Sequence, residues 1–317
     1  MAPLTPAGPR ADGRPLVCIV GPTASGKSAW ALRLAGELGY EILCVDSMTV
    51  YRGMDIGTAK PSPAERAAVV HHGLDLVEPT ETYTVARFVA YADAVIADAR
   101  RRGVGLICVG GTPLYFMALF RGLFDGPPAD ESLRLALQQM PADQRFAELQ
   151  RVDPVAASRL HPNDTKRVVR ALEVYRLTGQ PLSAQQTEWA AGTLRHRAVF
   201  VAPHWEKEQL NRRINARVKQ MIAAGWVEEV RRLPQPLSST AREAAGYELL
   251  LRHLRGELPL DEAVEQIKIA TRQLARRQVK WFRRWPEVMW LPGDDPTHAV
   301  KEVARRVAGA SRPSGGS

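Results

Sequence analysis

Short apolar runs recur along the chain, separated by longer stretches with the spacing of amphipathic helices. The runs that predict buried strands are 16–20, 41–45, 104–109, 198–202 and 288–291. The first three end in polar or glycine-rich turns, and helical stretches such as 84–102 connect them. This order is typical of a parallel sheet that binds its ligands beyond the carboxyl ends of its strands. We therefore expect these three turns to converge on one site.

A second region interrupts this alternation after the Gly-Pro-Pro at 126–128. Its predicted helices are 131–140, 144–151 and 165–178, and a strand signal returns only at 198. The last helix is expected to start after the N-cap pair Asn163-Asp164 and to stop at Gly179. We therefore expect a mostly helical insertion domain at 129–197 within a core formed by 15–128 and 198–307. Residues 1–14 and 308–317 are expected to be disordered. The predicted fold class is α/β, with a parallel-sheet core, this insertion and a helical C-terminal region.

The composition is that of an ordinary globular protein. Of 317 residues, 45% are hydrophobic and 24% charged, and no apolar run approaches the roughly 18 residues of a membrane span. The first residues lack the apolar segment of a signal peptide, so a cytoplasmic protein without membrane contact is expected. Cys18, Cys44 and Cys108 fall in apolar runs and predict buried thiols, and no Cys/His cluster indicates a metal finger.

The positive charge is confined to the later part of the chain. The net charge is +9, but residues 1–127 hold 12 basic and 12 acidic residues. The densest basic segment, 266–286, contains seven Lys/Arg and no acidic residue. At helical spacing its tryptophans face away from a cationic stripe made of Arg272, Arg276, Lys280 and Arg283. The stripe favours a polyanionic partner such as a nucleic acid, and a solvated surface helix is the alternative.

The most specific motif follows the first predicted strand. Residues 21–28 read GPTASGKS and fill the pattern G-x-x-x-x-G-K-[ST] between a strand and a helix. In such a P-loop the backbone N–H groups surround a phosphate, Lys27 supplies a positive charge and Ser28 a hydroxyl for Mg²⁺. The core is therefore expected to be P-loop NTPase-like. A purely structural glycine turn is the alternative.

Two further turns carry side chains that could take part in catalysis or ligand binding. Asp46 ends the second predicted strand, where a carboxylate holds Mg²⁺ through water or orients an attacking group. The third strand ends in Gly110, Gly111 and Thr112, a turn that lets the backbone approach a ligand and adds one hydroxyl. A role of Thr112 as a helix N-cap is the alternative.

Seven segments occur in an order that characterises one family of enzymes. They read GPTASGKS (21–28), DSMTVYRGMDIGTAKP (46–61), HHGLDLVEP (71–79), VGGTPLY (109–115), KRVVRALEVYRLTG (166–179), AAGYEL (244–249) and RRQVKWFRR (276–284). Together they resemble the tRNA dimethylallyltransferases, in their bacterial form, over 16–284. Thr49 stands where the family usually has Gln, and Pro113 where it usually has Gly.

The resemblance implies transfer of a dimethylallyl group from dimethylallyl diphosphate to tRNA. The acceptor would be N6 of the adenosine 3′-adjacent to the anticodon, in tRNAs that read codons beginning with U. Asp46 would act as general base, and Thr112 and Arg134 would bind the diphosphate. Mg²⁺ on Ser28 is the implied cofactor. The diphosphate-binding loop would comprise Gly21, Pro22, Thr23, Ala24, Ser25, Gly26, Lys27 and Ser28.

The resemblance also implies which residues contact the tRNA. Those near the target base would be Asp46, Ser47, Met48, Thr49, Thr112 and Arg134. Those farther along would be Lys166, Arg167, Val168, Val169, Arg170, Glu243, Ala244, Ala245, Gly246, Tyr247, Glu248, Arg276, Arg277, Gln278, Val279, Lys280, Trp281, Phe282 and Arg283. A monomer is expected, because no unassigned apolar stripe calls for a partner.

Two other functions remain compatible with the P-loop. One is an enzyme that acts on a small molecule, either a kinase or an adenylate isopentenyltransferase that prenylates free AMP. The other is a nucleic-acid-binding ATPase. The small-molecule enzymes do not need the basic segment 266–286, and the identity of the acceptor and the turnover of ATP distinguish all three.

Overall fold

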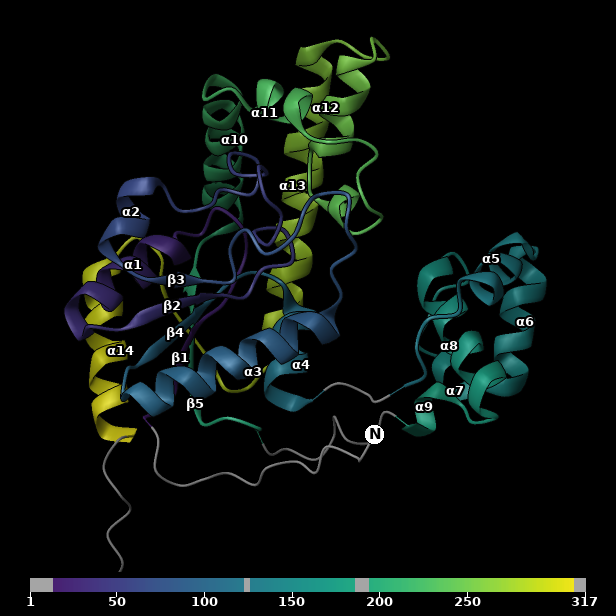
Figure 1. Ribbon diagram of the computed structural model, residues 1–317, viewed down its shortest axis with the longest axis horizontal. Helices are drawn as coiled ribbons and strands as arrows, with labels where there is room; N and C mark the ends of the chain where they lie inside the picture. Colours follow the sequence, from purple (N-terminus) through teal and green to yellow (C-terminus); the bar gives the residue numbers. More distant parts are fainter. Residues whose placement is uncertain (1–13, 123–125, 186–193, 311–317) are drawn as a thin grey trace, which may run out of the picture. The chain divides into compact units, whose positions relative to one another are not determined.

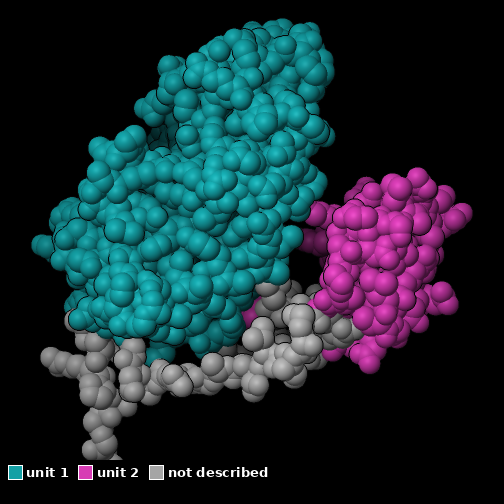
Figure 2. Space-filling view, in the orientation of Figure 1, with its two compact units in different colours: residues 1–120, 194–317 teal, residues 121–193 magenta. Residues whose placement is uncertain are grey.

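The computed structural model describes residues 14–122, 126–185 and 194–310. The chain divides into two compact units, one formed by Met1–Phe120 with Leu194–Ser317 and the other by Arg121–Thr193 (Figures 1 and 2). The second unit overlaps the insertion expected at 129–197 but begins and ends earlier. Residues 1–13 and 311–317, most of the segments expected to be disordered, lie outside the described residues. Residues 308–310 instead continue a helix.

A six-stranded parallel sheet forms the centre of the first unit. Its strand order is β3-β2-β4-β1-β5-β6, and neighbouring strands run parallel throughout. The strands are β1 (Leu16–Ile19), β2 (Glu41–Cys44), β3 (His71–His72), β4 (Leu106–Val109), β5 (Ala198–His204) and β6 (Val288–Pro292). The five apolar runs are all strands, as predicted. Only β3 was missed, because two residues carry no hydrophobic period.

Alternate residues of the strands face two separate cores. Val17 and Ile19 of β1 point toward helices α1 (Lys27–Leu38) and α14 (Pro296–Ala310). Leu16 and Cys18 point to the opposite face, toward α3 (Val85–Arg102) and α4 (Pro113–Arg121). Figure 1 shows α1 and α14 together at one side of the sheet. The strands are apolar throughout because both faces of the sheet are covered, and the three cysteines are buried free thiols, as predicted.

A group of helices follows β5 and forms the predicted helical C-terminal region (Figure 1). It comprises α10 (Lys207–Ala223), α11 (Trp226–Arg232), η2 (Ala241–Glu243), α12 (Tyr247–Leu254) and α13 (Leu260–Phe282). The short helix α2 (Pro63–Ala68) belongs to the earlier chain, between β2 and β3. The basic segment lies mainly on α13. Its two faces separate as predicted, since Ile267 and Trp285 are buried while Arg276, Lys280 and Arg283 are exposed.

The second unit is helical and has its own small core. Its helices are α5 (Glu131–Gln139), α6 (Ala142–Val152), α7 (Pro154–Ala157), α8 (Thr165–Thr178) and α9 (Leu182–Gln185). The predicted caps of α8 are present: the Asp164 side chain accepts a hydrogen bond from Arg167 N–H, and Gly179 ends the helix in the left-handed conformation. Leu137, Leu149 and Leu172 are buried together in the core.

The chain leaves the first unit and returns to it at neighbouring points. Phe120 is the last residue before the second unit, and Leu194 is the first after it. The Arg195 N–H donates to the Phe120 carbonyl at 2.8 Å, and the Arg195 guanidinium donates to the Leu119 carbonyl at 2.9 Å. These bonds fix the exit and the re-entry side by side within the first unit.

Candidate functional site

Three turns at the carboxyl ends of β1, β2 and β4 meet at one cavity, as the sequence predicted. The cavity has a volume of about 330 Å³. Residues of all three turns line it, namely Thr23, Ala24, Asp46, Ser47, Met48, Gly111 and Thr112. Helices α10 and α13 supply its other wall through residues such as Arg217 and Gln278. The strand order explains the meeting, because β4 lies between β1 and β2.

The P-loop at residues 21–28, called the phosphate loop from here on, is held in place by hydrogen-bond donors to two of its carbonyl groups. Arg213 Nε donates to the Ala24 carbonyl at 2.9 Å, and Trp205 Nε1 donates to the Ser25 carbonyl at 2.9 Å. The Arg213 guanidinium also stacks on the Trp205 ring, 4.1 Å from its centre. Gly26 has φ 94°, a left-handed conformation that favours glycine. The loop is thereby shaped in advance of any ligand.

Two cations lie beside this loop, and the pKa of each is lowered. Burial and the positive charge of Arg217 together lower the pKa of Lys27 to about 7, and the charge of Asp46 opposes both effects. Lys27 Nζ donates to the carbonyl of Pro22 at 2.6 Å. Burial also lowers the pKa of Arg217, again against the attraction of Asp46. A bound polyanion would relieve this crowding of positive charge.

Arg217 is a site residue that the sequence did not reveal. It projects from α10 and lines the 330 Å³ cavity together with two neighbours of about 780 and 300 Å³. The smaller neighbour contains Lys27 and Ser28. No motif marks Arg217, because it lies in an ordinary amphipathic helix with several other basic residues. Only the fold brings it to the phosphate loop.

Asp46 and Thr112 are joined through the turn after β2. Asp46 Oδ1 accepts a hydrogen bond from the Met48 N–H at 2.9 Å, and its second oxygen is left for a ligand. The Thr112 hydroxyl accepts from the Ser47 N–H at 3.0 Å. The Thr112 side chain therefore ties two turns together. Thr112 also directly precedes α4, and its carbonyl accepts from the Phe116 N–H at 3.3 Å, so it stands at the N-cap position as the alternative proposed. Both side chains are partly exposed to the cavity.

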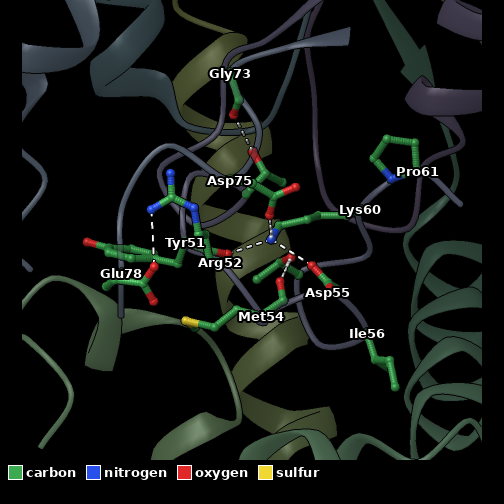
Figure 3. Close-up of polar contacts among 12 residues, drawn as sticks. Tyr51, Arg52, Met54, Asp55, Ile56, Lys60, Pro61, Gly73, Asp75 and Glu78 are labelled. Atoms are coloured by element: carbon green, nitrogen blue, oxygen red, sulfur yellow. Dashed lines mark hydrogen bonds and ion pairs between the residues drawn. The ribbon is translucent and has the colours of Figure 1, made fainter. Parts of the chain in front are cut away.

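The segment after Asp46 folds around the amino group of Lys60. Its Nζ donates to the Tyr51 carbonyl at 2.5 Å, to Asp55 at 2.7 Å and to Asp75 at 2.6 Å, as Figure 3 shows. Burial raises the pKa of Asp75, but its hydrogen bonds with Lys60 and Arg66 outweigh that effect and lower it. This irregular segment is thus held by buried polar contacts where a helix or strand would use backbone ladders.

Thr49 does not take the position expected for it within this segment. Its side chain is 7% exposed and its hydroxyl lies 3.5 Å from the Gly73 carbonyl. It does not line the cavity, whereas Asp46, Ser47 and Met48 do. The expected tRNA contact of the Thr49 side chain is therefore not supported by its burial.

Arg134 is bound by an ion pair inside the second unit. Its Nε and Nη2 donate to the two Glu173 oxygens at 2.8 and 3.1 Å, and Arg170 donates to the same carboxylate at 2.7 Å. Glu173 is fully buried; burial raises its pKa, and the two arginines lower it by more. The diphosphate contact expected of Arg134 stays a prediction.

Several other residues expected to contact tRNA are buried in a core. Val168 and Val169 pack inside the second unit, because they lie on the inner face of α8, while Lys166 and Arg167 are exposed. In the first unit the buried ones are Ala244, Gly246, Tyr247, Gln278 and Phe282. Of these, Ala244 and Gln278 nevertheless line the 330 Å³ cavity. The RNA contacts expected of all these residues stay predictions.

The remaining expected contacts lie at the surface of the first unit to differing degrees. The exposed ones are Glu243, Arg276, Arg277, Lys280 and Arg283, and the partly exposed ones are Ala245, Glu248, Val279 and Trp281. Arg272, the other member of the predicted cationic stripe, is partly buried and donates to Asn215 at 2.8 Å. The cationic surface is therefore shorter than the sequence predicted.

Comparison with known proteins gives the family. A profile of the family described as IPP transferase matches residues 49–285. This chain belongs to the IPP transferase family. A second profile, described as isopentenyl transferase, matches residues 15–71, which include the phosphate loop and Asp46.

Relatives in the IPP transferase family resemble the chain over most of its length. The tRNA dimethylallyltransferase of Geobacter metallireducens is 49% identical over 87% of this chain and 92% of its own. That of Geobacillus thermodenitrificans is 43% identical over 94% and 97%. A tRNA isopentenylpyrophosphate transferase from Bacillus halodurans has a similar fold, with a TM-score of 0.68, 34% identity and coverage of 94% and 98%. A eukaryotic dimethylallyltransferase acting on tRNA gives a TM-score of 0.81 at 28% identity, covering 95% and 81%.

Proposed function

We propose that this chain is a tRNA dimethylallyltransferase. It transfers a dimethylallyl group from dimethylallyl diphosphate to N6 of the adenosine 3′-adjacent to the anticodon, in tRNAs that read codons beginning with U. The observation that carries the proposal is a pair of cavities at the phosphate loop, one lined by Asp46 and the other by Lys27, with Arg217 lining both. The names of the relatives support tRNA as the acceptor and dimethylallyl as the transferred group.

The two cavities together offer a partner for each charge that the reaction creates. The adenine N6 forms a bond to the allylic carbon while the C–O bond to the diphosphate breaks, and the bonding electrons leave with the diphosphate. Lys27 and Arg217 stabilise the charge that develops there. Asp46 accepts the proton from the adenine amine. An exocyclic amine is a poor nucleophile, so the held geometry of the turns contributes as much as basicity.

Mg²⁺ fits the phosphate loop as a partner of the substrate. The Ser28 hydroxyl is exposed and lines the same cavity as Lys27. Among the described residues no group of three or more His, Cys, Asp or Glu side chains is placed to hold a metal ion. Mg²⁺ is usually bound by few protein oxygens together with substrate phosphates and water, so Ser28 with a diphosphate matches its chemistry. When bound, the ion would neutralise part of the leaving-group charge.

An RNA acceptor is supported by the cations beside the cavity. Arg277 lines the cavity, and Arg276 and Lys280 are exposed on the same helix, α13. A base that reacts inside an enzyme must leave its stack, and cations on the rim can hold the flanking phosphates while it does so. Among the described residues no helix is long and apolar enough to cross a membrane.

The proposal is tested by the identity of the acceptor. The protein is incubated with Mg²⁺ and radiolabelled dimethylallyl diphosphate, and with unmodified tRNA, AMP or no acceptor; ATP turnover is measured in parallel. We expect label in tRNA alone, at the adenosine next to the anticodon, and no ATP hydrolysis. Label in AMP would indicate an adenylate isopentenyltransferase, and RNA-stimulated ATP hydrolysis without transfer would indicate an ATPase. Either result would overturn the proposal.

A further inference from the structure

Gln278 lies among the expected RNA contacts of α13 but reaches into the interior. Its side chain is 7% exposed, while its neighbours Arg276 and Arg277 are exposed. Gln278 Nε2 donates to the Gly111 carbonyl at 2.7 Å, and its Oε1 accepts from the Thr23 N–H at 2.9 Å. One amide thus joins the phosphate loop to the turn that carries Thr112.

The orientation of this amide is fixed by its partners. A carbonyl only accepts and a backbone N–H only donates, so Nε2 must face Gly111 and Oε1 must face Thr23. The contact also requires glycine at 111, because a Cβ there would lie 2.6 Å from Gln278 Nε2. A side chain at this position would push the amide out of reach of both turns.

The bridge holds the phosphate loop at Thr23, which the outer donors do not bind. Arg213 and Trp205 bind the carbonyls of Ala24 and Ser25 from the far side. Gln278 binds the N–H of Thr23 from the side of the cavity, which both residues line. The spacing between the phosphate loop and the Thr112 turn is therefore set by a residue of α13.

We propose that Gln278 is a positioning residue that sets the phosphate loop for the diphosphate, in place of the RNA contact that the sequence implied. The inference rests on the proposed function for the identity of the diphosphate. It assigns two roles to one helix: exposed cations of α13 face the RNA, and the buried amide of the same helix shapes the phosphate loop. Loss of the amide should weaken diphosphate binding and leave RNA binding intact.

The experiment compares Gln278→Met with Gln273→Met. Both variants remove an amide from α13 and keep the length of the side chain, but Gln273 is exposed. Titration calorimetry with inorganic pyrophosphate and Mg²⁺, filter binding with tRNA, and steady-state kinetics are measured on the full chain. For Gln278→Met we expect at least a tenfold rise in the pyrophosphate Kd and in the KM for dimethylallyl diphosphate. The tRNA Kd should stay within twofold, and Gln273→Met should match wild type throughout.

The opposite pattern of changes in the pyrophosphate Kd and the tRNA Kd contradicts the inference. A tRNA Kd that rises while the pyrophosphate Kd stays within twofold would make Gln278 an RNA contact, and no change in either would remove any positioning role. Gln278→Glu serves where the methionine variant does not fold: it keeps the acceptor for Thr23, loses the donor to Gly111, and should weaken pyrophosphate at least tenfold. Wild-type protein that binds no pyrophosphate would contradict the proposed function itself.

Discussion

At the residue scale, Lys27 is the group whose charge depends most on what the site holds. Its amino group is buried, bonded to one loop carbonyl and placed near a second cation. Without a ligand this environment disfavours the protonated amine, and the pKa falls to about 7. A diphosphate reverses the balance, because its negative charge favours the protonated form.

The affinity for pyrophosphate should therefore fall as the pH rises above about 7. Free Lys27 loses its proton near that pH, whereas the complex keeps it to a higher pH, so binding takes up one proton between the two pKa values. We expect a loss of up to about tenfold in affinity per pH unit in this window. Calorimetry in buffers of different ionisation enthalpy measures the proton uptake. Lys27→Met should abolish this uptake. A pyrophosphate affinity that does not change with pH in either protein would show that Lys27 does not take up the proton.

Asp46 should be needed for transfer but not for RNA binding. Asp46→Asn keeps an oxygen for the Met48 N–H and so preserves the turn, but an amide does not accept the proton of the adenine amine. We expect the single-turnover transfer rate to fall by about 10² or more, as is typical for loss of a general base. The tRNA Kd, measured in the same preparation, should change less than about twofold. A rate within about tenfold of wild type would show that Asp46 is not the base.

The sequence predicted those site residues that belong to contiguous motifs. Asp46 and the phosphate loop were recognisable because each directly follows a strand, and parallel strands bring such positions together. Arg217 and Gln278 were not assigned to the phosphate loop, since their roles depend on contacts across 167 or more positions in the chain, as between Gln278 and Gly111. An arginine in a basic amphipathic helix gives no local sign of such a contact.

At the element scale, the irregular segment between Asp46 and Pro61 depends on a carboxylate of α11. Glu229 accepts hydrogen bonds from the N–H groups of Asp55 at 2.8 Å, Ile56 at 2.5 Å and Gly57 at 3.2 Å. It also accepts from the Tyr247 hydroxyl at 2.7 Å. One side chain thereby satisfies three consecutive backbone donors that no helix or strand would otherwise pair.

Glu229→Ala should lower the free energy of unfolding by about 1–3 kcal/mol, because it leaves these donors without a partner. Urea denaturation of the full chain provides the measurement. Glu228→Ala is the matched control: it lies next to Glu229 on α11 but is exposed and paired with Arg231 at the surface. Its effect should stay within about 0.5 kcal/mol. Equal effects of the two substitutions would mean that the Glu229 carboxylate does not support the segment.

Helices and strands were predictable where their sequences show a hydrophobic periodicity or helix-capping residues. The ends of α8 followed from Asp164 and Gly179, which are local signals. The fold of 46–61 was not predictable in the same way, because Lys60 and Glu229 hold it through distant partners. The resemblance drew attention to this segment without saying how its backbone is supported.

At the scale of the whole molecule, part of the positive charge is already paired within the protein. Many arginines are paired with carboxylates, as Arg102 is with Glu41 and Asp98. On α13 and just after it, Arg276, Lys280 and Arg283 are exposed, and the sequence 266–286 contains no acidic residue. Binding energy from phosphate contacts should therefore concentrate in this short segment.

The salt dependence of tRNA binding tests whether the phosphate contacts lie mainly in this segment. The triple variant Arg276→Ala, Lys280→Ala and Arg283→Ala should reduce the slope of log K against log salt by about one for each RNA phosphate that it no longer neutralises. The control triple is Arg101→Ala, Arg231→Ala and Arg305→Ala, three exposed arginines that are paired with carboxylates. It should leave the slope unchanged. Equal slopes for both triples would place the RNA on another surface.

The hydrogen bonds between Arg195 and the end of α4 make the core independent of what lies between them. Residues of the first unit hold the two ends of the connection between β4 and β5 together. The second unit is therefore an insertion whose first and last residues attach to the first unit at neighbouring positions. The entropy of closing a loop grows only slowly with length, by about 0.6 kcal/mol for each doubling. Over evolution, such a segment can lengthen, shorten or be exchanged with little effect on the free energy of unfolding of the sheet.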